Sequence, residues 1–100
     1  MLSSHFRHET MTPTAIIDVR SPQEFAAGHL EGAVNIPYDQ ILQRIDSIEG
    51  VEKSSELLLY CQSGARSAIA CSLLVQQGFE RVMNGGAFRT LLMSFKGTIA

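Results

Sequence analysis

The sequence lacks the features that would tie it to a membrane or to nucleic acid. No run of apolar residues approaches the roughly 20 that a membrane-spanning helix needs. The 8 Lys and Arg residues are outnumbered by 10 Asp and Glu residues, and the formal net charge of −2 offers no general attraction for nucleic acid or an anionic membrane. The first residues are polar and mixed, without the apolar middle of a signal peptide, so we expect a cytoplasmic protein.

Cysteine is also scarce. The 2 cysteines, Cys61 and Cys71, form neither a CxxC pair nor a four-ligand zinc pattern, and we expect neither a metal site nor a cofactor. A structural disulfide between them is not expected in a cytoplasmic protein. A lone cysteine in a loop is instead a candidate nucleophile, and Cys61 lies in a predicted loop.

The length and hydrophobic content of the chain are sufficient for one small domain. The chain has 100 residues, of which 45% are hydrophobic, as in ordinary globular proteins. We expect residues 1–14 to form a flexible lead-in, residues 15–94 to form the domain and residues 95–100 to form a tail.

Short apolar runs and helical spacing alternate along this domain. The apolar runs predict strands over residues 15–19, 32–37, 57–60 and 81–83. The helical patterns predict helices over residues 22–27, 38–48, 67–77 and 88–93. Strands that alternate with helices at short intervals indicate an α/β fold with a mostly parallel sheet.

Several details of these elements can be checked against a structure. Ser21 is the predicted N-cap of the first helix, with Pro22 as its first residue and Glu24 completing a capping box. The apolar face of the second helix is predicted to contain Ile41, Leu42, Ile45 and Ile48. The third helix is expected to face the sheet with Ala68, Cys71, Leu74 and Val75. The segment Asn84-Gly85-Gly86 is predicted to be a turn.

Two turns stand where parallel sheets bind ligands, beyond the carboxyl ends of the strands. Asp18-Val19-Arg20 ends the first predicted strand, and Cys61–Arg66 follows the third. The order strand, cysteine, four residues, arginine and helix places a thiol at the positive end of a helix dipole. Gly64 allows the backbone N–H groups to converge, and Arg66 can stabilise the loop or bind an oxyanion. These surroundings favour the thiolate, the nucleophilic form of cysteine.

A cysteine after an apolar strand can also be a small buried hydrophobe. The combination of Cys61 with Ser63, Gly64, Arg66 and an immediate helix favours the catalytic interpretation. The same donors could hold a persulfide, an S-phosphate or an S-arsenate.

The motifs resemble those of a single-domain rhodanese, a thiosulfate sulfurtransferase, from about Ala15 to Phe88. The resemblance rests on several motifs in order: Ile17-Asp18-Val19-Arg20, Glu24-Phe25, Gly28-His29-Leu30, Gly32-Ala33, Asn35-Ile36-Pro37, Tyr60–Ser67, Gly78-Phe79 and Asn84-Gly85-Gly86. The short form is most similar to the minimal bacterial type known as phage shock protein E, which is usually exported. The resemblance implies a three-layer α/β fold in which a short sheet of four or five strands has helices on both faces.

The resemblance also implies the chemistry. Cys61 would take the outer sulfur of thiosulfate, release sulfite and pass the sulfur to cyanide or to a thiol acceptor such as a thioredoxin-like protein. The implied binding segment is Gln62, Ser63, Gly64, Ala65, Arg66 and Ser67. Its backbone amides would stabilise the persulfide, while Arg66 would close the loop and is a candidate for seating thiosulfate. Related phosphatases use a loop one residue longer, so the short loop favours sulfur transfer.

Three supporting residues are expected near this loop. For Asp18 and Arg20 a structural role is favoured over substrate contact, with Arg20 paired to Glu24 or Asp18. His29 could act as an acid or base, but a hydrogen bond to the turn after the first helix is favoured. Cys71 is expected to face the core rather than to resolve the persulfide of Cys61.

The chain departs from the family in ways that leave alternatives open. It has no Trp near the Gly-Gly motif, and Phe88 is expected to fill part of that space. It leaves little room for an extra strand before Ala15, so an exposed sheet edge could support a weak dimer as well as a monomer. A protein-to-protein sulfur relay, a small phosphatase or arsenate reductase, and a non-catalytic interaction domain are the competing functions.

Overall fold

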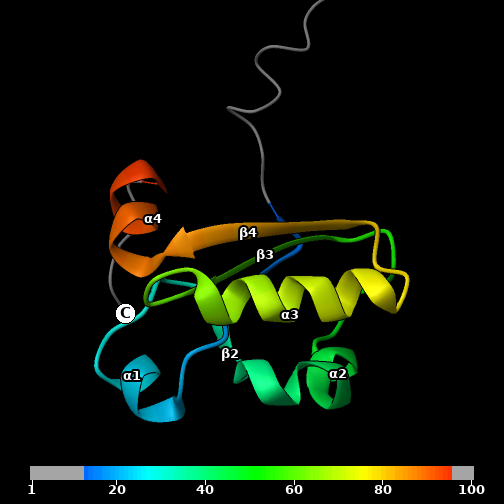
Figure 1. Ribbon diagram of the computed structural model, residues 1–100, viewed down its shortest axis with the longest axis horizontal. Helices are drawn as coiled ribbons and strands as arrows, with labels where there is room; N and C mark the ends of the chain where they lie inside the picture. The colour runs from blue at the N-terminus through cyan, green and yellow to red at the C-terminus, as the bar shows by residue number, and fades with distance from the viewer. Residues whose placement is uncertain (1–12, 96–100) are drawn as a thin grey trace, which may run out of the picture.

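The computed structural model describes residues 13–95, which form a parallel sheet flanked by helices (Figure 1). The strand order is β2-β1-β3-β4, and the strands are β1 Ala15–Asp18, β2 Val34–Asn35, β3 Glu56–Cys61 and β4 Arg81–Ala87. The helices are α1 Pro22–Ala26, α2 Ile41–Arg44, α3 Ala65–Gln76 and α4 Phe88–Phe95. The α/β fold with a parallel sheet is therefore confirmed, with four strands. Except for residues 13, 14 and 95, the predicted lead-in and tail lie outside the described residues.

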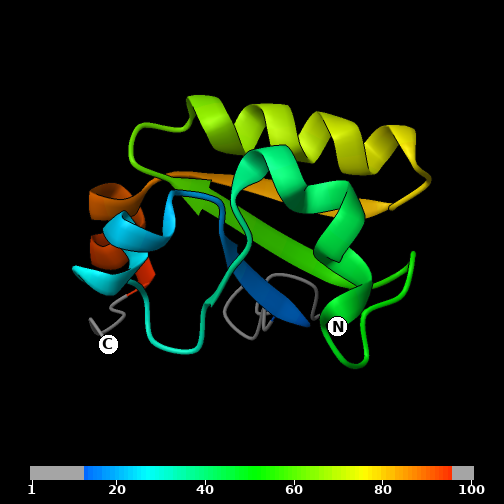
Figure 2. The ribbon, with the colours of Figure 1, turned by 90° about the horizontal axis from the view of Figure 1, so that it is seen from below.

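The central strand β3 is buried on both faces, which explains its continuous apolar sequence. Its alternate residues Leu57, Leu59 and Cys61 belong to a core cluster that includes Leu74 of α3. Leu58 and Tyr60 point to the opposite face and pack in a smaller cluster with Leu91 of α4. Figure 2 shows α2 and α3 on one side of the sheet, while α4 closes one end of the molecule. The expectation of helices on both faces is met.

The capping box of α1 forms as predicted from the sequence. The Ser21 hydroxyl accepts the Glu24 amide at 3.2 Å, and the Glu24 carboxylate accepts the Ser21 amide at 2.9 Å. The helix buries none of its own residues, so these two bonds and Pro22 at its start supply its local stability. They also fix the position of the Glu24 carboxylate.

The third helix differs from the prediction in its start and its rotation. It begins at Ala65, two residues early, because Gly64 serves as the N-cap with φ +105°. Its buried residues are Ser67, Ala70 and Leu74, whereas Ala68 and Val75 are exposed and Cys71 is half-buried. The predicted face was therefore wrong for Ala68 and Val75. The amide of Ser67 is directed at Cys61, and this contact fixes the rotation of the helix.

The segment Asn84-Gly85-Gly86 is not a turn but part of β4. Asn84 pairs with Leu59 and Gly86 with Tyr60, so Gly85 is the extra residue of a bulge. A Cβ on Gly85 would lie 3.0 Å from Leu91 and 3.1 Å from Leu58, which explains why a residue without a side chain stands there. The two glycines permit an irregular strand here, and the same Gly-Gly pair led the sequence pattern to predict a turn.

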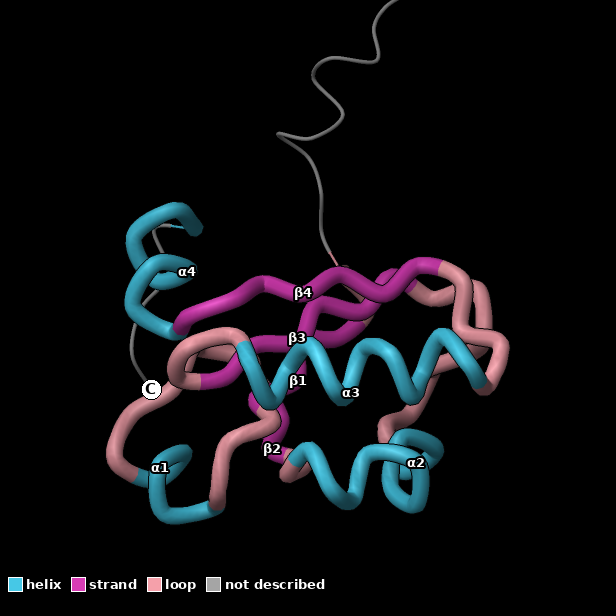
Figure 3. The backbone as a smooth tube through the Cα atoms, viewed as in Figure 1, coloured by secondary structure: helices cyan, strands magenta, loops and turns pink. Residues whose placement is uncertain are grey.

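The second predicted helix is divided into short pieces. The 3₁₀ turns η2 Tyr38–Gln40 and η3 Ile45–Ser47 flank the single α-helical turn of α2, as Figure 3 traces along the backbone. Ile41 and Ile45 are buried, but Leu42 is 38% exposed, contrary to the predicted apolar face. The second strand is likewise shorter than predicted and covers only Val34 and Asn35.

This topology creates a binding position between two central strands. The chain runs from β1 outward to β2 and then crosses back to β3, so the strand order reverses between β1 and β3. Ligands in open α/β sheets bind at such a point, beyond the carboxyl ends of the strands. Asp18 ends β1 and Cys61 ends β3, and both lie at this position.

Candidate active site

The sulfur of Cys61 lies inside a ring of hydrogen-bond donors at the end of β3. The Gly64 amide donates to Sγ at 3.0 Å and the Ser67 amide donates to it at 3.4 Å. The Cys61 thiol in turn donates to the Ser67 hydroxyl, with 3.6 Å between Sγ and Oγ. These donors exist because the loop joins directly to α3, whose first amides have no carbonyl partner within the helix. The backbone cradle predicted from the sequence is present in the structure.

The surroundings of Cys61 shift the pKa of its thiol in two opposing directions. Burial, the largest single influence, raises the pKa of the thiol because it disfavours a charged sulfur. The hydroxyl and amide of Ser67 and the amides of Gly64 and Ser63 stabilise the thiolate, and together they outweigh burial, so the pKa of Cys61 is lowered. The thiolate form of Cys61 is therefore favoured although the residue is fully buried.

Asn84 holds the cradle from the neighbouring strand. Its side-chain oxygen accepts the Ser67 hydroxyl at 2.6 Å and the Gly86 amide at 2.9 Å, and its Nδ2 donates to the Gly64 carbonyl at 3.3 Å. Gly64 and Ser67 both donate an amide hydrogen bond to the sulfur. The bulge in β4 thus places one amide side chain against both of them.

Gly64 adopts a backbone conformation that other residues rarely adopt. Its φ of +105° turns the chain from β3 into α3 and directs its N–H at the sulfur. A Cβ at this position would lie 3.5 Å from Gly86 Cα, an ordinary contact. The requirement for glycine is therefore conformational rather than a matter of space.

Asp18 and Arg20 form a buried ion pair behind the loop. The side chains are 0% and 4% exposed, and the shortest contact is 2.6 Å between Arg20 Nη2 and Asp18 Oδ2. Arg20 also donates to the Gly28 carbonyl at 2.7 Å and to Gln62 Oε1 at 3.3 Å. Of the two partners considered for Arg20, the structure selects Asp18. The pair links β1, the end of α1 and the cysteine loop.

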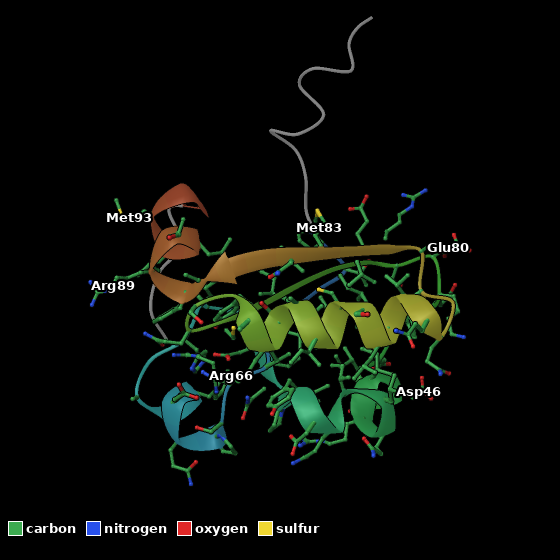
Figure 4. The ribbon with its side chains drawn as sticks, in the orientation of Figure 1. Asp46, Arg66, Glu80, Met83, Arg89 and Met93 are labelled. Carbon is green, nitrogen blue, oxygen red and sulfur yellow. The ribbon has the colours of Figure 1, made fainter. Side chains whose placement is uncertain are left out.

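Arg66 is clamped by Glu24 across 42 positions of the sequence. Its two terminal nitrogens donate to the two carboxylate oxygens at 2.7 and 3.1 Å. The hydrogen bonds from Arg66 oppose burial and, with the Ser21 amide, hold the pKa of Glu24 at about 2. Figure 4 shows Arg66 between α1 and the start of α3. The capping glutamate of α1 thus also fixes the arginine that closes the loop.

A pocket of about 330 Å³ opens beside the loop. Among the residues that line it are Arg20, Glu24, Gln62, Phe88, Arg89 and Leu92. Phe88 stacks with Tyr60 at 5.7 Å between ring centroids, and the Arg20 guanidinium lies 4.5 Å from the centre of the Phe88 ring. Gln62, the residue after Cys61 in the chain, contributes to the lining of this pocket.

The remaining predicted residues have the following places. Gln62, Ser63 and Ala65 are exposed on the outer side of the loop. His29 lies with Nδ1 2.8 Å from the Phe25 carbonyl and its ring stacked on Phe25, at a centroid distance of 3.5 Å. Cys71 packs against the larger core cluster, where burial raises the pKa of its thiol to about 11.

Three residues at the site were not recognised from the sequence. Glu24 was assigned to the capping box and considered as a partner of Arg20 but not of Arg66, Asn84 was assigned to a turn within a family motif, and Arg89 was given no role. The sequence offers a signal only for Asn84, whose Gly-Gly neighbours are also typical of a bulge. The contacts of Glu24 and the place of Arg89 depend on tertiary structure, which local patterns do not encode.

Two further classes of site find no support in the described residues. No group of three or more His, Cys, Asp or Glu side chains within residues 13–95 could hold a metal ion. None of the helices described is long and apolar enough to cross a membrane.

Comparison with known proteins identifies the family of the chain. A sulfurtransferase of Allochromatium vinosum is 41% identical over 69 residues, which cover 69% of this chain and 62% of that protein. Thiosulfate sulfurtransferase PspE of Escherichia coli is 32% identical over 77 residues, covering 77% of this chain and 73% of PspE. A solved structure described as rhodanese with anions from E. coli superimposes with a TM-score of 0.71 at 32% identity, over 75% of this chain and 87% of that one. The Rhodanese-like domain family matches residues 4–89, and the chain belongs to this sulfurtransferase family.

Proposed function

We propose that the protein transfers the sulfane sulfur of thiosulfate to a nucleophilic acceptor through a persulfide on Cys61. In the first step the Cys61 thiolate attacks the outer sulfur of thiosulfate. A new S–S bond forms on Cys61 and the S–S bond of thiosulfate breaks, so sulfite leaves with the electron pair. One thiolate and one dianion give one persulfide anion and one sulfite dianion.

In the second step an acceptor attacks the outer sulfur of the persulfide. With cyanide, a C–S bond forms as the S–S bond breaks, thiocyanate leaves and the Cys61 thiolate is restored. With a thiolate acceptor, the product is the persulfide of that thiol. A thioredoxin-like protein offers such a thiol in a form that could dock at the loop.

The observation that carries this proposal is the pair of amide donors on the sulfur of Cys61, at 3.0 and 3.4 Å. The same donors that favour the thiolate would hold a terminal persulfide anion at nearly the same position. Four residues separate Cys61 from Arg66, and this compact loop suits one sulfur atom better than a tetrahedral phosphate. The name of the PspE relative supports thiosulfate as the donor.

We propose distinct roles for the side chains around the sulfur. Ser67 would stabilise the charged sulfur through its hydroxyl, and Arg66 would act through Glu24 by holding the loop closed. Asp18 and Arg20 would fix the loop from behind through Gln62. Gln62, Ser63 and Ala65 would shape access to the pocket, because they lie on its exposed side.

Intact-protein mass spectrometry tests the proposal directly. Incubation with thiosulfate should add the mass of one sulfur atom, and subsequent cyanide should remove it and produce thiocyanate. Cys61→Ser should abolish the mass increase, whereas the matched variant Cys71→Ser should retain it. An unchanged mass increase in Cys61→Ser would refute the assignment of the nucleophile.

The same experiment separates the competing functions. A stable persulfide with negligible thiosulfate turnover would favour a protein-to-protein sulfur relay. Hydrolysis of an aryl phosphate without any persulfide would favour a phosphatase.

A further inference from the structure

Two of the three arginines around the loop are held in ion pairs. Arg20 is paired with Asp18, and Arg66 is paired with Glu24. Arg89, which is exposed, has no ion pair among the residues that the structure describes. It is therefore the cation beside the loop whose charge is not already neutralised by a neighbouring carboxylate.

Arg89 lines the same pocket as Gln62, the residue that follows Cys61 in the loop. It stands in the first turn of α4, directly after Phe88, whose ring lies under the Arg20 guanidinium. Figure 4 shows Arg89 extending from α4 at the end of the molecule where Arg66 lies. Because β4 passes into α4 without a connecting loop, the bulged strand fixes the point from which Arg89 extends.

A second pocket near the loop has the opposite character. It has a volume of about 260 Å³, and its lining includes Arg66, Tyr38 and Asp39. The Arg66 charge is neutralised by Glu24, so the exposed carboxylate of Asp39 gives this pocket an excess negative charge. An anionic donor is therefore attracted to the pocket of Arg89 and repelled from the pocket of Asp39.

The proposed reaction needs such a cation. A thiolate and a thiosulfate dianion repel each other, and the amides on Cys61 are already engaged with its sulfur. Arg20 cannot supply the missing charge, since its Nε and Nη2 groups are held by Asp18 and the Gly28 carbonyl. A flexible guanidinium at the pocket rim can approach the sulfonate end of the donor while the outer sulfur faces Cys61.

We infer that Arg89 is the specificity-determining residue for the donor, selecting anionic sulfur donors by charge at the rim of the pocket. This inference rests on the proposed function of Cys61 and assigns the recognition of the anion to α4. The outer sulfur still moves to Cys61 as sulfite leaves, and Arg89 takes no part in the bond changes.

The first test compares two variants with a charge-matched control. Arg89→Gln should lower kcat/KM for thiosulfate by about tenfold, through a higher KM at nearly unchanged kcat, and Arg89→Glu should lower it further. Arg44→Gln removes one positive charge from α2, where Arg44 is exposed and donates to Gln40, and it should change neither constant. Raising the ionic strength should shrink the difference between wild type and Arg89→Gln. Unchanged kinetics in Arg89→Gln, or an equal loss in Arg44→Gln, would overturn the inference.

The second test does not depend on sulfur transfer. Iodoacetate is an anion and iodoacetamide is neutral, and both alkylate a thiolate through the same displacement of iodide. The ratio of their rates at Cys61, followed by peptide mass spectrometry, should fall by about tenfold in Arg89→Gln and stay constant in Arg44→Gln. A purely structural effect of Arg89 would change both rates together, and an unchanged ratio would refute the inference.

The two tests also separate this inference from the proposed function. If wild type formed no persulfide with thiosulfate but its alkylation ratio depended on Arg89, the proposed donor would be wrong and anion selection would stand. If wild type turned over thiosulfate and neither measurement responded to Arg89, only the role of Arg89 would fail.

Discussion

The two cysteines of the chain offer a comparison of one side chain in two environments. Cys61 ends a strand and is fully buried, while Cys71 lies in the middle of α3 and is half-buried. Burial raises the pKa of both thiols. Cys71 is left with a pKa of about 11, whereas the donors around Cys61 reverse the direction and lower its pKa.

The difference indicates that position relative to the helix, rather than burial, sets the direction in which each thiol's pKa is shifted. Amides in the interior of a helix are bonded to carbonyls one turn earlier, so Cys71 receives none of them. The first amides of a helix have no such partner, and the loop brings two donors to Cys61. A thiol just before a helix can therefore accept hydrogen bonds from the first amides of that helix, whereas a thiol within the helix cannot.

The largest expected effect is the contrast in reactivity between the two thiols. Their pKa values lie on opposite sides of 9.0, with Cys71 at about 11. Although a more basic thiolate is more nucleophilic, the larger thiolate fraction dominates near neutral pH, so Cys61 should be alkylated roughly tenfold faster or more. The rate at Cys61 should level off at a lower pH than the rate at Cys71, which should rise until about pH 11. Peptide mass spectrometry over a pH series measures both, and a shared titration would contradict the comparison.

Gly64→Ala should bring the pKa and the alkylation rate of Cys61 closer to those of Cys71. The φ of +105° is strained for alanine, by about 1–3 kcal/mol, and relief of that strain would turn the amide away from the sulfur. Loss of this donor should raise the pKa of Cys61 by about one to two units and slow its alkylation roughly three- to tenfold at neutral pH.

Gly50→Ala is the matched control for this variant. Gly50 has φ +87°, and an added Cβ would meet nothing within 4 Å, so the substitution carries a similar backbone strain far from the sulfur. It should lower the melting temperature without changing the reactivity of Cys61. Equal loss of reactivity in both variants would show that strain alone, rather than the amide of Gly64, is responsible.

The features that follow from local chemistry were predictable from the sequence. The capping box of α1 depends on residues three positions apart, and the apolar strand before Cys61 needs only its own composition. The cradle follows from the direct junction of strand, loop and helix. These parts of the fold and the site are encoded within short stretches of the chain.

The features that join distant stretches were not predictable. The rotation of α3 depends on the contact between Ser67 and Cys61, and the bulge of β4 depends on Gly85 fitting between Leu58 and Leu91. The partner of Arg66 comes from α1. Helical periodicity alone places a stripe with an uncertainty of about one position, which suffices to move Ala68 from one face to another.

Ser67→Ala tests the hydroxyl separately from the amides, because it removes the hydroxyl and leaves both amides in place. The hydroxyl is 3.6 Å from the sulfur, and its loss should raise the pKa of Cys61 by about one unit. The alkylation rate at neutral pH should then fall roughly threefold. Ser72→Ala, on the exposed side of α3, is the control and should leave the rate unchanged. A rate equal to wild type in Ser67→Ala would mean that the amides alone stabilise the thiolate.

Cys71→Ser should have the smallest effect on the chemistry. Cys71 packs against the larger core cluster and is not among the residues that donate to the sulfur of Cys61, so the persulfide on Cys61 should form at the wild-type rate. A hydroxyl among apolar neighbours should lower the free energy of unfolding by about 1 kcal/mol, whereas Cys71→Ala should restore part of that loss. Urea denaturation measures the stability, and intact mass after thiosulfate measures the persulfide. A loss of the persulfide at unchanged stability would instead make Cys71 a participant in sulfur transfer, and the contrast between a reactive and an inert cysteine would no longer hold.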